Sequence, residues 1–354
     1  MKHLDKKSFS NELLYSIPIL SKKILELECG DGSLGEAFRK INPNSTYIGI
    51  ENNINSKEKA KSKLNQVISG DTQDLHIELF EKHRFDCILI NNLMQNNKII
   101  DKLIFNYKRL LNKNGTLIIF MKNPRHSILK NGLNERNRDL KEFKRLVDIN
   151  YSMNGKSDIV NLLNNERMNI SKVIQKHTNS INIKEFFEVN SKAINFYNIN
   201  KERLIEDISP IEYIFVSSIN STQRLHLHAI SKLEVGTSDV RIINPLKYLS
   251  SLNGVSIGLT KEIENVNLKI ETENVPRIII WQRPIHEYNR SIASLKSFIQ
   301  NKFIIITEFD DNPDNWKLIK DNNYLTFRGV HAVQVSTEPL KKVIKKYNPE
   351  VRVF

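Results

Sequence analysis

The chain has 354 residues, of which 40% are hydrophobic and 26% charged, values typical of a soluble globular protein with room for two domains. Its two cysteines exclude a disulfide framework and a cysteine-based zinc site, and they fit a reducing cytoplasm. The first residues lack a secretory apolar region, and no apolar run reaches the roughly 18 to 20 residues of a membrane helix. We therefore expect a cytoplasmic protein without a membrane span.

The formal net charge of +13 raises the question of an acidic partner, because clustered Lys and Arg bind phosphates. The basic residues are instead scattered and often lie beside acids, as in NSKEKAKSK (55–63). We interpret the charge as a solvated Lys- and Asn-rich surface and do not expect a nucleic-acid partner. An anionic sugar, a lipid carrier or RNA is the alternative.

Strand-like and helix-like segments alternate in the first third of the chain. The strand-like segments are 23–28, 46–51, 67–70, 85–90 and 116–121. The helix-like segments are 34–41, 56–64, 75–82 and 99–111, the last ending before the stop signal Asn114-Gly115. This alternation indicates βαβ units. It predicts an α/β, Rossmann-like domain with a mostly parallel seven-stranded sheet.

The sequence then becomes polar and Asn-rich, which predicts a helical insertion over about 124–200 before the strand 211–218. The segment NSTQR (220–224) is typical of a linker. A second α/β pattern follows, with strands at 225–230, 255–260, 277–282 and 303–309 and helices at 240–252 and 291–300. Pro245 should mark a first turn or a kink in the first of these helices. We predict two domains, 1–222 and 225–354.

A glycine-rich turn joins the first strand to the first helix. Gly30, Gly32 and Gly35 form a G-x-G-x-x-G pattern, in which glycine permits a tight turn and close approach of the backbone to a nucleotide. A helix N-terminus follows directly. The pattern alone fits a dinucleotide-binding fingerprint nearly as well as a methyltransferase.

Acidic residues at three successive strand ends distinguish these two readings. Glu26 lies inside the first strand, where it suits an ammonium group, whereas Glu26 and Asp31 would repel a pyrophosphate. Glu51 can accept from both hydroxyls of a ribose, and Asp71 of Gly70-Asp71 from an adenine amino group. Ligands of open α/β sheets bind in the crevice at this edge, so the set favours S-adenosylmethionine. The alternative for each acid is a helix cap or a loop carboxylate.

These motifs carry a resemblance to a known family. Residues 23–122 resemble a class I S-adenosylmethionine-dependent methyltransferase, through the glycine loop, TYIGIE, VISGD, FDCILI and LLNKNGTLIIF. The chain is most similar to bacterial carbohydrate-pathway methyltransferases that carry a fused glycosyltransferase. The resemblance implies S-adenosyl-L-methionine as cofactor, no metal, and a sugar or glycan acceptor. The residues expected to bind the cofactor are Glu26, Glu28, Gly30, Gly32, Glu51, Asn52, Gly70, Asp71 and Asn91.

The chain departs from that family pattern in two places. Glu28 stands where the family has the first glycine of the loop, and NLMQN (92–96) stands where D-V-L-E-H is expected. The second change removes the acids and the imidazole that the family has there. His126 in KNPRH matches a histidine common at that place in the similar proteins, and it is our candidate for a catalytic base. The alternative is an ordinary loop histidine.

The second predicted domain resembles the N-terminal half of a GT-B glycosyltransferase, through LHLHAI, IIIWQRP, EFDDNPDNW and the segment 324–354. We interpret Asp310, Asp311 and Asp314 as acceptor-side or turn residues and not as metal ligands. The half that would bind a nucleotide-sugar is not in the sequence, so we expect a truncated module that transfers no sugar alone. An exposed cleft surface would favour homo-oligomer formation.

The sequence therefore favours a cytoplasmic S-adenosylmethionine-dependent methyltransferase that acts on a sugar or glycan intermediate of cell-surface polysaccharide biosynthesis. One alternative is a catalytically degenerate protein that binds cofactor or glycan, which the altered loop and NLMQN favour. Another is an RNA methyltransferase, which predicts a contiguous basic face beside the cofactor crevice.

Overall fold

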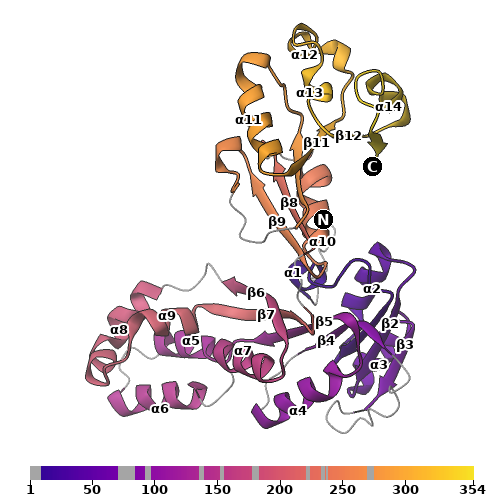
Figure 1. Ribbon diagram of the computed structural model, residues 1–354. Coiled ribbons are helices and arrows are strands. Elements are labelled where there is room, and N and C mark those ends of the chain that lie inside the picture. The colour runs from indigo at the N-terminus through magenta and orange to yellow at the C-terminus, as the bar shows by residue number, and fades with distance from the viewer. Residues whose placement is uncertain are drawn as a thin grey trace, which may run out of the picture. The chain divides into compact units, whose positions relative to one another are not determined.

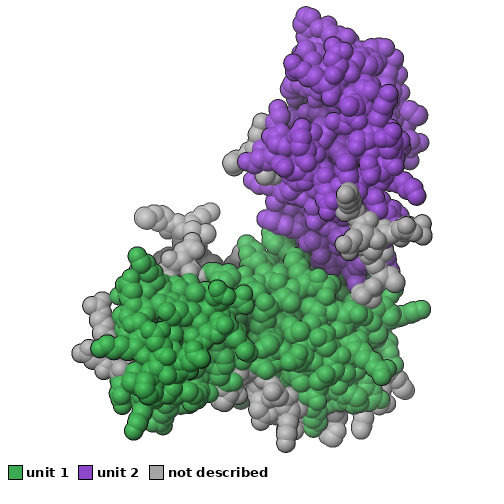
Figure 2. Space-filling model, turned by 60° about the vertical axis from the view of Figure 1, so that its left-hand side comes forward, with its two compact units in different colours: residues 1–221 green, residues 222–354 purple. Residues whose placement is uncertain are grey.

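The computed structural model describes residues 9–70, 84–91, 97–134, 139–151, 155–177, 183–220, 224–232, 236, 238–268 and 275–354. The chain forms two compact units, Met1–Ser221 (unit 1) and Thr222–Phe354 (unit 2), which Figure 2 shows in different colours. Each unit has its own sheet and its own core. None of the helices in the described ranges combines the length and apolar character needed to cross a membrane.

Unit 1 is built on a seven-stranded sheet of order β3-β2-β1-β4-β5-β7-β6 (Figure 1). Its strands are β1 (Lys23–Leu27), β2 (Thr46–Glu51), β3 (Gln66–Ser69), β4 (Phe85–Ile90), β5 (Leu111–Lys122), β6 (Asn169–His177) and β7 (Pro210–Ser218). The first five strands pair in parallel, whereas β7 pairs antiparallel with both β5 and β6. The mixed α/β fold and the seven-stranded sheet expected from the sequence are thus confirmed.

Successive residues of each strand point to opposite sides of this sheet, and helices cover both of its faces. Ile24 packs with α1 (Asn11–Leu14), α2 (Ser33–Ile41) and α3 (Ile54–Lys61). Its neighbour Leu25 lies in the core on the other face, which α4 (Asn97–Lys108) and α7 (Lys156–Asn165) cover. Burial on both faces explains why the strands are nearly continuous apolar runs in the sequence.

The helical insertion has a separate small core of aromatic and aliphatic side chains, in which Phe143 packs against Phe186. The remaining helices of unit 1 are α4 (Asn97–Lys108), α5 (His126–Asn134), α6 (Leu140–Tyr151), α7 (Lys156–Asn165), α8 (Ile183–Phe196) and α9 (Lys201–Ile208). The insertion is not wholly helical as the sequence suggested, because β6 lies within it. The partner of β6 is β7, some 40 residues further along the chain, and local periodicity does not reveal such a pairing.

A second correction concerns the segment before the fifth strand. The helix predicted over 99–111 ends at Lys108, and the strand predicted over 116–121 already begins at Leu111, which pairs with Phe85. A Cβ atom at Gly115 would lie 2.9 Å from the carbonyl oxygen of Phe85, so this glycine permits close strand approach and does not stop the helix. The predicted helix 75–82 lies outside the described residues.

Unit 2 is a six-stranded, wholly parallel sheet of order β13-β12-β11-β10-β8-β9. Its strands are β8 (Leu225–Ile230), β9 (Val255–Thr260), β10 (Arg277–Gln282), β11 (Phe303–Phe309), β12 (Ala332–Val335) and β13 (Val351–Val353). The strand order reverses between β8 and β10. Ligands of open α/β sheets bind at such a switch point, outside the carboxyl ends of the strands.

The two faces of the unit 2 sheet are covered unequally. Most of the core lies on the face packed by α11 (Tyr288–Gln300), α12 (Lys317–Asp321), α13 (Leu325–Arg328) and α14 (Glu338–Ile344). The opposite face packs η2 (Asp239–Ile243) and α10 (Asn244–Leu249) in a smaller cluster. The helix predicted over 240–252 begins as the π-helical turn η2, and Pro245 lies in the first turn of α10. Two short 3₁₀ turns, η3 (Ile263–Asn265) and η4 (Pro313–Asn315), complete the unit.

Candidate functional site

The candidate cofactor residues of unit 1 come from the carboxyl ends of three neighbouring strands. β1 places Glu26, β2 ends at Glu51, and Asn91 follows β4. The Nδ2 atom of Asn91 donates to Oε1 of Glu26 at 2.7 Å, and the backbone N–H of Asn91 donates to the carbonyl of Leu27. β1 and β4 also flank the point where the strand order of this sheet reverses. The fold thus brings together residues that lie 65 positions apart in the sequence.

Glu26 is a buried carboxyl group that is only partly satisfied. The residue is 1% exposed, and its Oε2 atom has no hydrogen-bond partner within the described part of the chain. Burial raises the pKa of Glu26 from 4.5 to about 8, against interactions with the Asn91 amide and the Tyr47 hydroxyl, which lower it. An unpartnered buried acceptor is costly unless a ligand supplies a donor. The ammonium group of S-adenosylmethionine is such a donor, so this residue fits the cofactor.

The glycine loop follows β1 with the backbone geometry that its sequence requires. Gly30 and Gly32 have φ angles of 58° and 75°, in the left-handed region that glycine adopts without strain, and Gly32 caps α2. Glu28 also has a positive φ of 55°, at the position where the family has glycine. A side chain in this conformation costs about 1 kcal/mol or more. The departure seen in the sequence is therefore a strained position in the fold.

Glu51 fixes the loop from the neighbouring strand. Its Oε2 atom accepts from the N–H of Gly30 at 2.7 Å, and its Oε1 atom accepts from the N–H of Asn53 at 2.8 Å. The carboxylate therefore orders the glycine loop and the start of α3 together. Each oxygen has a second lone pair, which remains suited to a ribose hydroxyl.

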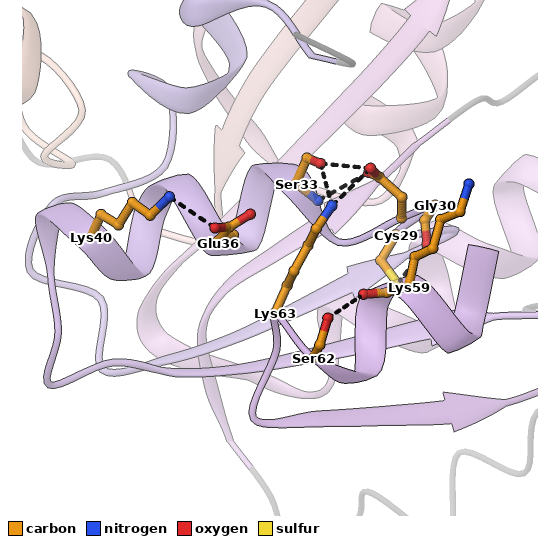
Figure 3. Close-up of polar contacts among 9 residues, drawn as sticks. Cys29, Gly30, Ser33, Glu36, Lys40, Lys59, Ser62 and Lys63 are labelled. Atoms are coloured by element: carbon orange, nitrogen blue, oxygen red, sulfur yellow. Dashed lines mark hydrogen bonds and ion pairs between the residues drawn. The ribbon is translucent and has the colours of Figure 1, made fainter. Parts of the chain in front are cut away.

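A lysine that the sequence did not single out completes the loop. Lys63 donates to Oδ2 of Asp31 and to Oγ of Ser33, both at 2.8 Å, and Figure 3 shows Lys63 reaching Ser33 at the start of α2. Burial raises the pKa of Asp31, but the hydrogen bonds from Lys63 and Ser33 outweigh it and lower the pKa to about 2. Asp31 is therefore ionised, and its negative charge is neutralised by Lys63. The pair of Lys63 and Asp31 is visible only in the tertiary structure, where the segment after α3 packs beside the start of α2.

The remaining cofactor predictions have different outcomes. Asn52 is exposed and Gly70 is half-buried directly after β3. Asp71 and the segment NLMQN lie outside the described residues. The structure therefore pairs Asn91 with Glu26 and Gly30 with Glu51 at the same edge of the sheet, and it does not test the adenine contact.

His126 is the first residue of α5, directly beyond β5. Its Nδ1 atom lies 2.9 Å from the carbonyl oxygen of Ile208, at the end of α9. A carbonyl only accepts, so Nδ1 carries the proton and Nε2 keeps the lone pair. The described contacts of His126 lead to α9 and not to the cofactor residues.

Comparisons with known proteins agree with this geometry. Residues 21–177, less than half of the chain, match the model of a family described as a methyltransferase domain. No curated protein matches the chain.

Solved structures give weaker likenesses. The plantazolicin methyltransferase BpumL in complex with SAH is 18% identical, with 59% of this chain and 84% of that chain covered and a TM-score of 0.38. A geranyl diphosphate methyltransferase in complex with SAM is 11% identical, with 59% and 83% covered and a TM-score of 0.38. The geranyl diphosphate C-methyltransferase from Streptomyces coelicolor A3(2) is 13% identical, with 56% and 73% covered and a TM-score of 0.35. At these values the likeness says nothing about the substrate of this chain.

The sheet order, the glycine loop and the family match define unit 1 as a methyltransferase domain. The match assigns methyl transfer to residues 21–177, and the glycine loop and the buried acid beside it fit S-adenosyl-L-methionine as the cofactor. The expectations from the sequence on enzyme class and cofactor are confirmed.

The raised pKa of Glu26 predicts a pH-dependent stability. Between pH 4.5 and about 8 the folded protein keeps a proton that the unfolded chain releases. The free energy of unfolding should therefore fall as the pH rises through this window, by on the order of 1 kcal/mol per pH unit. Glu26→Gln cannot ionise and should remove this slope. Urea unfolding of the cofactor-free protein at pH 5.5 and pH 8, followed by circular dichroism, measures it.

The matched control for this prediction is Glu58→Gln, on the exposed face of α3. This variant should keep the slope of the unmodified protein. If the free energy of unfolding changes equally with pH in the unmodified protein and in Glu26→Gln, Glu26 is ionised in the folded protein and this prediction is wrong.

Proposed function

We propose that the chain transfers a methyl group from S-adenosylmethionine to a hydroxyl of a sugar or glycan intermediate, in the cytoplasm, during cell-surface polysaccharide biosynthesis. The resemblance to carbohydrate-pathway methyltransferases motivates this acceptor. The observation that carries it is the orientation of His126, whose Nδ1 is bonded to the carbonyl of Ile208. This hydrogen bond supports a role for Nε2 as a base.

A hydroxyl acceptor needs such a base, whereas most of the remaining catalysis is in-line positioning of acceptor and methyl group. S-adenosylmethionine supplies the methyl group when it is bound. Glu26 would hold its ammonium group, and Glu51 would hold its ribose. Nε2 of His126 would accept the proton that the acceptor hydroxyl loses.

The experiment uses the full chain with S-adenosylmethionine labelled in its methyl group. Three acceptor mixtures are offered separately: sugars and nucleotide-sugars, an RNA transcript, and an unrelated unfolded protein. Label in the sugar fraction is the expected result. His126→Gln should lower kcat by about a hundredfold or more without changing the dissociation constant of S-adenosylmethionine.

Label confined to the RNA would favour the RNA methyltransferase that the net charge suggested. An unchanged kcat in His126→Gln would remove this histidine from the reaction.

The second candidate function is a protein that binds the cofactor without transferring its methyl group. The strained backbone at Glu28 favours it, because a side chain replaces glycine where the methionine end of the cofactor is expected. Calorimetric titration with S-adenosylmethionine separates the two. Binding without label in any acceptor supports the second function, whereas binding with label supports the first.

Unit 2 enters this proposal as the N-terminal half of a GT-B-like glycosyltransferase. Its parallel sheet and the motifs LHLHAI and EFDDNPDNW support this assignment. Sheet residues such as Ile304, 43% exposed, support self-association through the less covered face.

A further inference from the structure

The end of α9 and the start of α5 lie side by side in unit 1 (Figure 1). α9 ends at Ile208, and β7 begins at Pro210, which has no N–H group. The last carbonyl groups of a helix have no donor within the helix, so other groups must satisfy them. Here the donors come from the segment 123–126, which links β5 to α5.

Asn123 holds the backbone on both sides of Ile208. Its Nδ2 atom donates to the carbonyl of Asp207 and to the carbonyl of Pro210, each at 2.7 Å. An amide nitrogen carries two protons, so both of its donors are used. Asn123 is 5% exposed, and its own N–H donates to the carbonyl of Ile211 at 2.9 Å. One buried residue therefore fixes the whole turn from α9 into β7.

The same residue also fixes the start of α5. Oδ1 of Asn123 accepts from the N–H of Arg125 at 3.1 Å, and the carbonyl of Asn123 accepts from the N–H of His126 at 3.2 Å. Pro124 follows, and a proline favours in the residue before it the extended backbone of a helix cap. Asn123 thus sets the backbone of His126 relative to that of Ile208.

The hydrogen bond between the His126 ring and the Ile208 carbonyl forms between these two fixed points. Nδ1 lies 2.9 Å from the carbonyl oxygen, and the bond made by one ring nitrogen decides which of the two carries the proton. The carboxyl end of α9 is also the negative end of the helix dipole, which stabilises the imidazolium that forms when Nε2 accepts a proton. Both effects depend on the distance between the two segments.

From these contacts we infer that Asn123 is a positioning residue for His126, which sets the tautomer of the imidazole by holding the Ile208 carbonyl at Nδ1. The effect on methyl transfer rests on the function proposed above, whereas the effect on the tautomer does not. Asn123 acts through the histidine, and no contact with cofactor or acceptor is assigned to it.

A purely structural role for Asn123 predicts a loss of stability and nothing more. The chain offers a matched control in Asn348 of unit 2, which is 3% exposed. Its Nδ2 atom donates to the carbonyls of Phe327 and Val330 at 2.8 and 3.0 Å. Asn348→Ser therefore removes the same kind of double contact in the other unit, and it should change neither the His126 tautomer nor methyl transfer.

The test is nitrogen-15 NMR of the full chain labelled at histidine, recorded at pH 8, with His126→Gln to assign the His126 signals. In the unmodified protein the proton should lie on Nδ1. Asn123→Ser keeps an acceptor for the N–H of Arg125, but one hydroxyl cannot donate to two carbonyls. In this variant the tautomer protonated at Nε2 should become at least as populated as the other.

The same variant should slow methyl transfer to the mixture of sugars and nucleotide-sugars at least about fivefold, the effect of one lost hydrogen bond. The dissociation constant of S-adenosylmethionine should not change. Asn123→Asp is the second variant, because it keeps the volume and Oδ1 but loses both donors, and it should move the tautomer in the same direction. Thermal unfolding verifies that each variant is folded.

Two results would overturn the inference: a proton on Nε2 in the unmodified protein, which needs no variant, and an unchanged tautomer in a folded variant of Asn123. A changed tautomer together with undiminished methyl transfer in His126→Gln would support the control of the imidazole by Asn123 and remove the proposed base. An unchanged tautomer with methyl transfer lost in His126→Gln would keep the proposed base and contradict the role of Asn123.

Discussion

Replacing Glu51 with alanine is expected to weaken the binding of S-adenosylmethionine by roughly ten- to a hundredfold. Hydrogen bonds to a charged group contribute about 1.5 to 3 kcal/mol, which corresponds to this range of affinity. Glu51 also accepts from the N–H groups of Gly30 and Asn53. Glu51→Ala therefore removes the hydrogen bonds that hold the glycine loop as well as the expected partner of the ribose hydroxyls. Isothermal titration calorimetry with the full chain measures the dissociation constant.

Two further variants sharpen this experiment. Glu51→Gln keeps one acceptor oxygen and should lose less affinity than Glu51→Ala. Glu58→Ala, an exposed acid of α3 paired with Lys61, should not change the affinity. A dissociation constant unchanged in Glu51→Ala would remove Glu51 from the cofactor site.

Replacing Arg125 with alanine is expected to destabilise unit 1 by about 2 to 4 kcal/mol. Its guanidinium contacts Asp158 and Asp207, each at 3.2 Å, and lies 4.3 Å from the centre of the Tyr151 ring. Arg125 is itself 5% exposed and ties three segments of the insertion to the end of β5. Removal leaves two carboxylates without their cation, and the loss of one member of a buried pair is strongly destabilising.

Two probes locate the effect of Arg125→Ala. The two tryptophans of the chain, Trp281 and Trp316, both lie in unit 2, so their fluorescence follows that unit, whereas circular dichroism follows both. The variant should shift the part of the dichroism transition that comes from unit 1 and leave the fluorescence transition in place. Arg290→Ala, which removes an exposed pair with Glu287, is the control. Coincident shifts of both probes would contradict the assignment to unit 1.

Much of the fold is determined by local patterns. The strands β1, β2 and β4 are apolar runs buried on both faces, and the segments that punctuate them are rich in glycine, asparagine and charge. The glycine loop needs positive φ angles at Gly30 and Gly32, and glycine supplies them at little cost. Alternation of such runs with helical periodicity specifies a doubly wound sheet, since parallel strands need crossovers.

The errors occur where a distant segment decides the outcome. Leu111 fits the apolar period of the preceding helix, but its pairing with Phe85 makes it a strand residue. β6 alternates weakly and becomes a strand because β7 provides its partner. In each case the free energy of pairing across the sheet exceeds the small differences in local propensity.

The sequence by itself determined the class of protein, because the glycine loop and the acids at strand ends are local signals tied to one ligand. Only the tertiary structure decided how these groups are satisfied. Asp31 pairs with Lys63, and Asn91 donates to Glu26, so each contact joins residues that are distant in the sequence. The second carboxyl oxygen of Glu26 has no partner within the described part of the chain. Charge, burial and hydrogen bonding of a side chain depend on neighbours brought by the fold, and sequence spacing does not encode those neighbours.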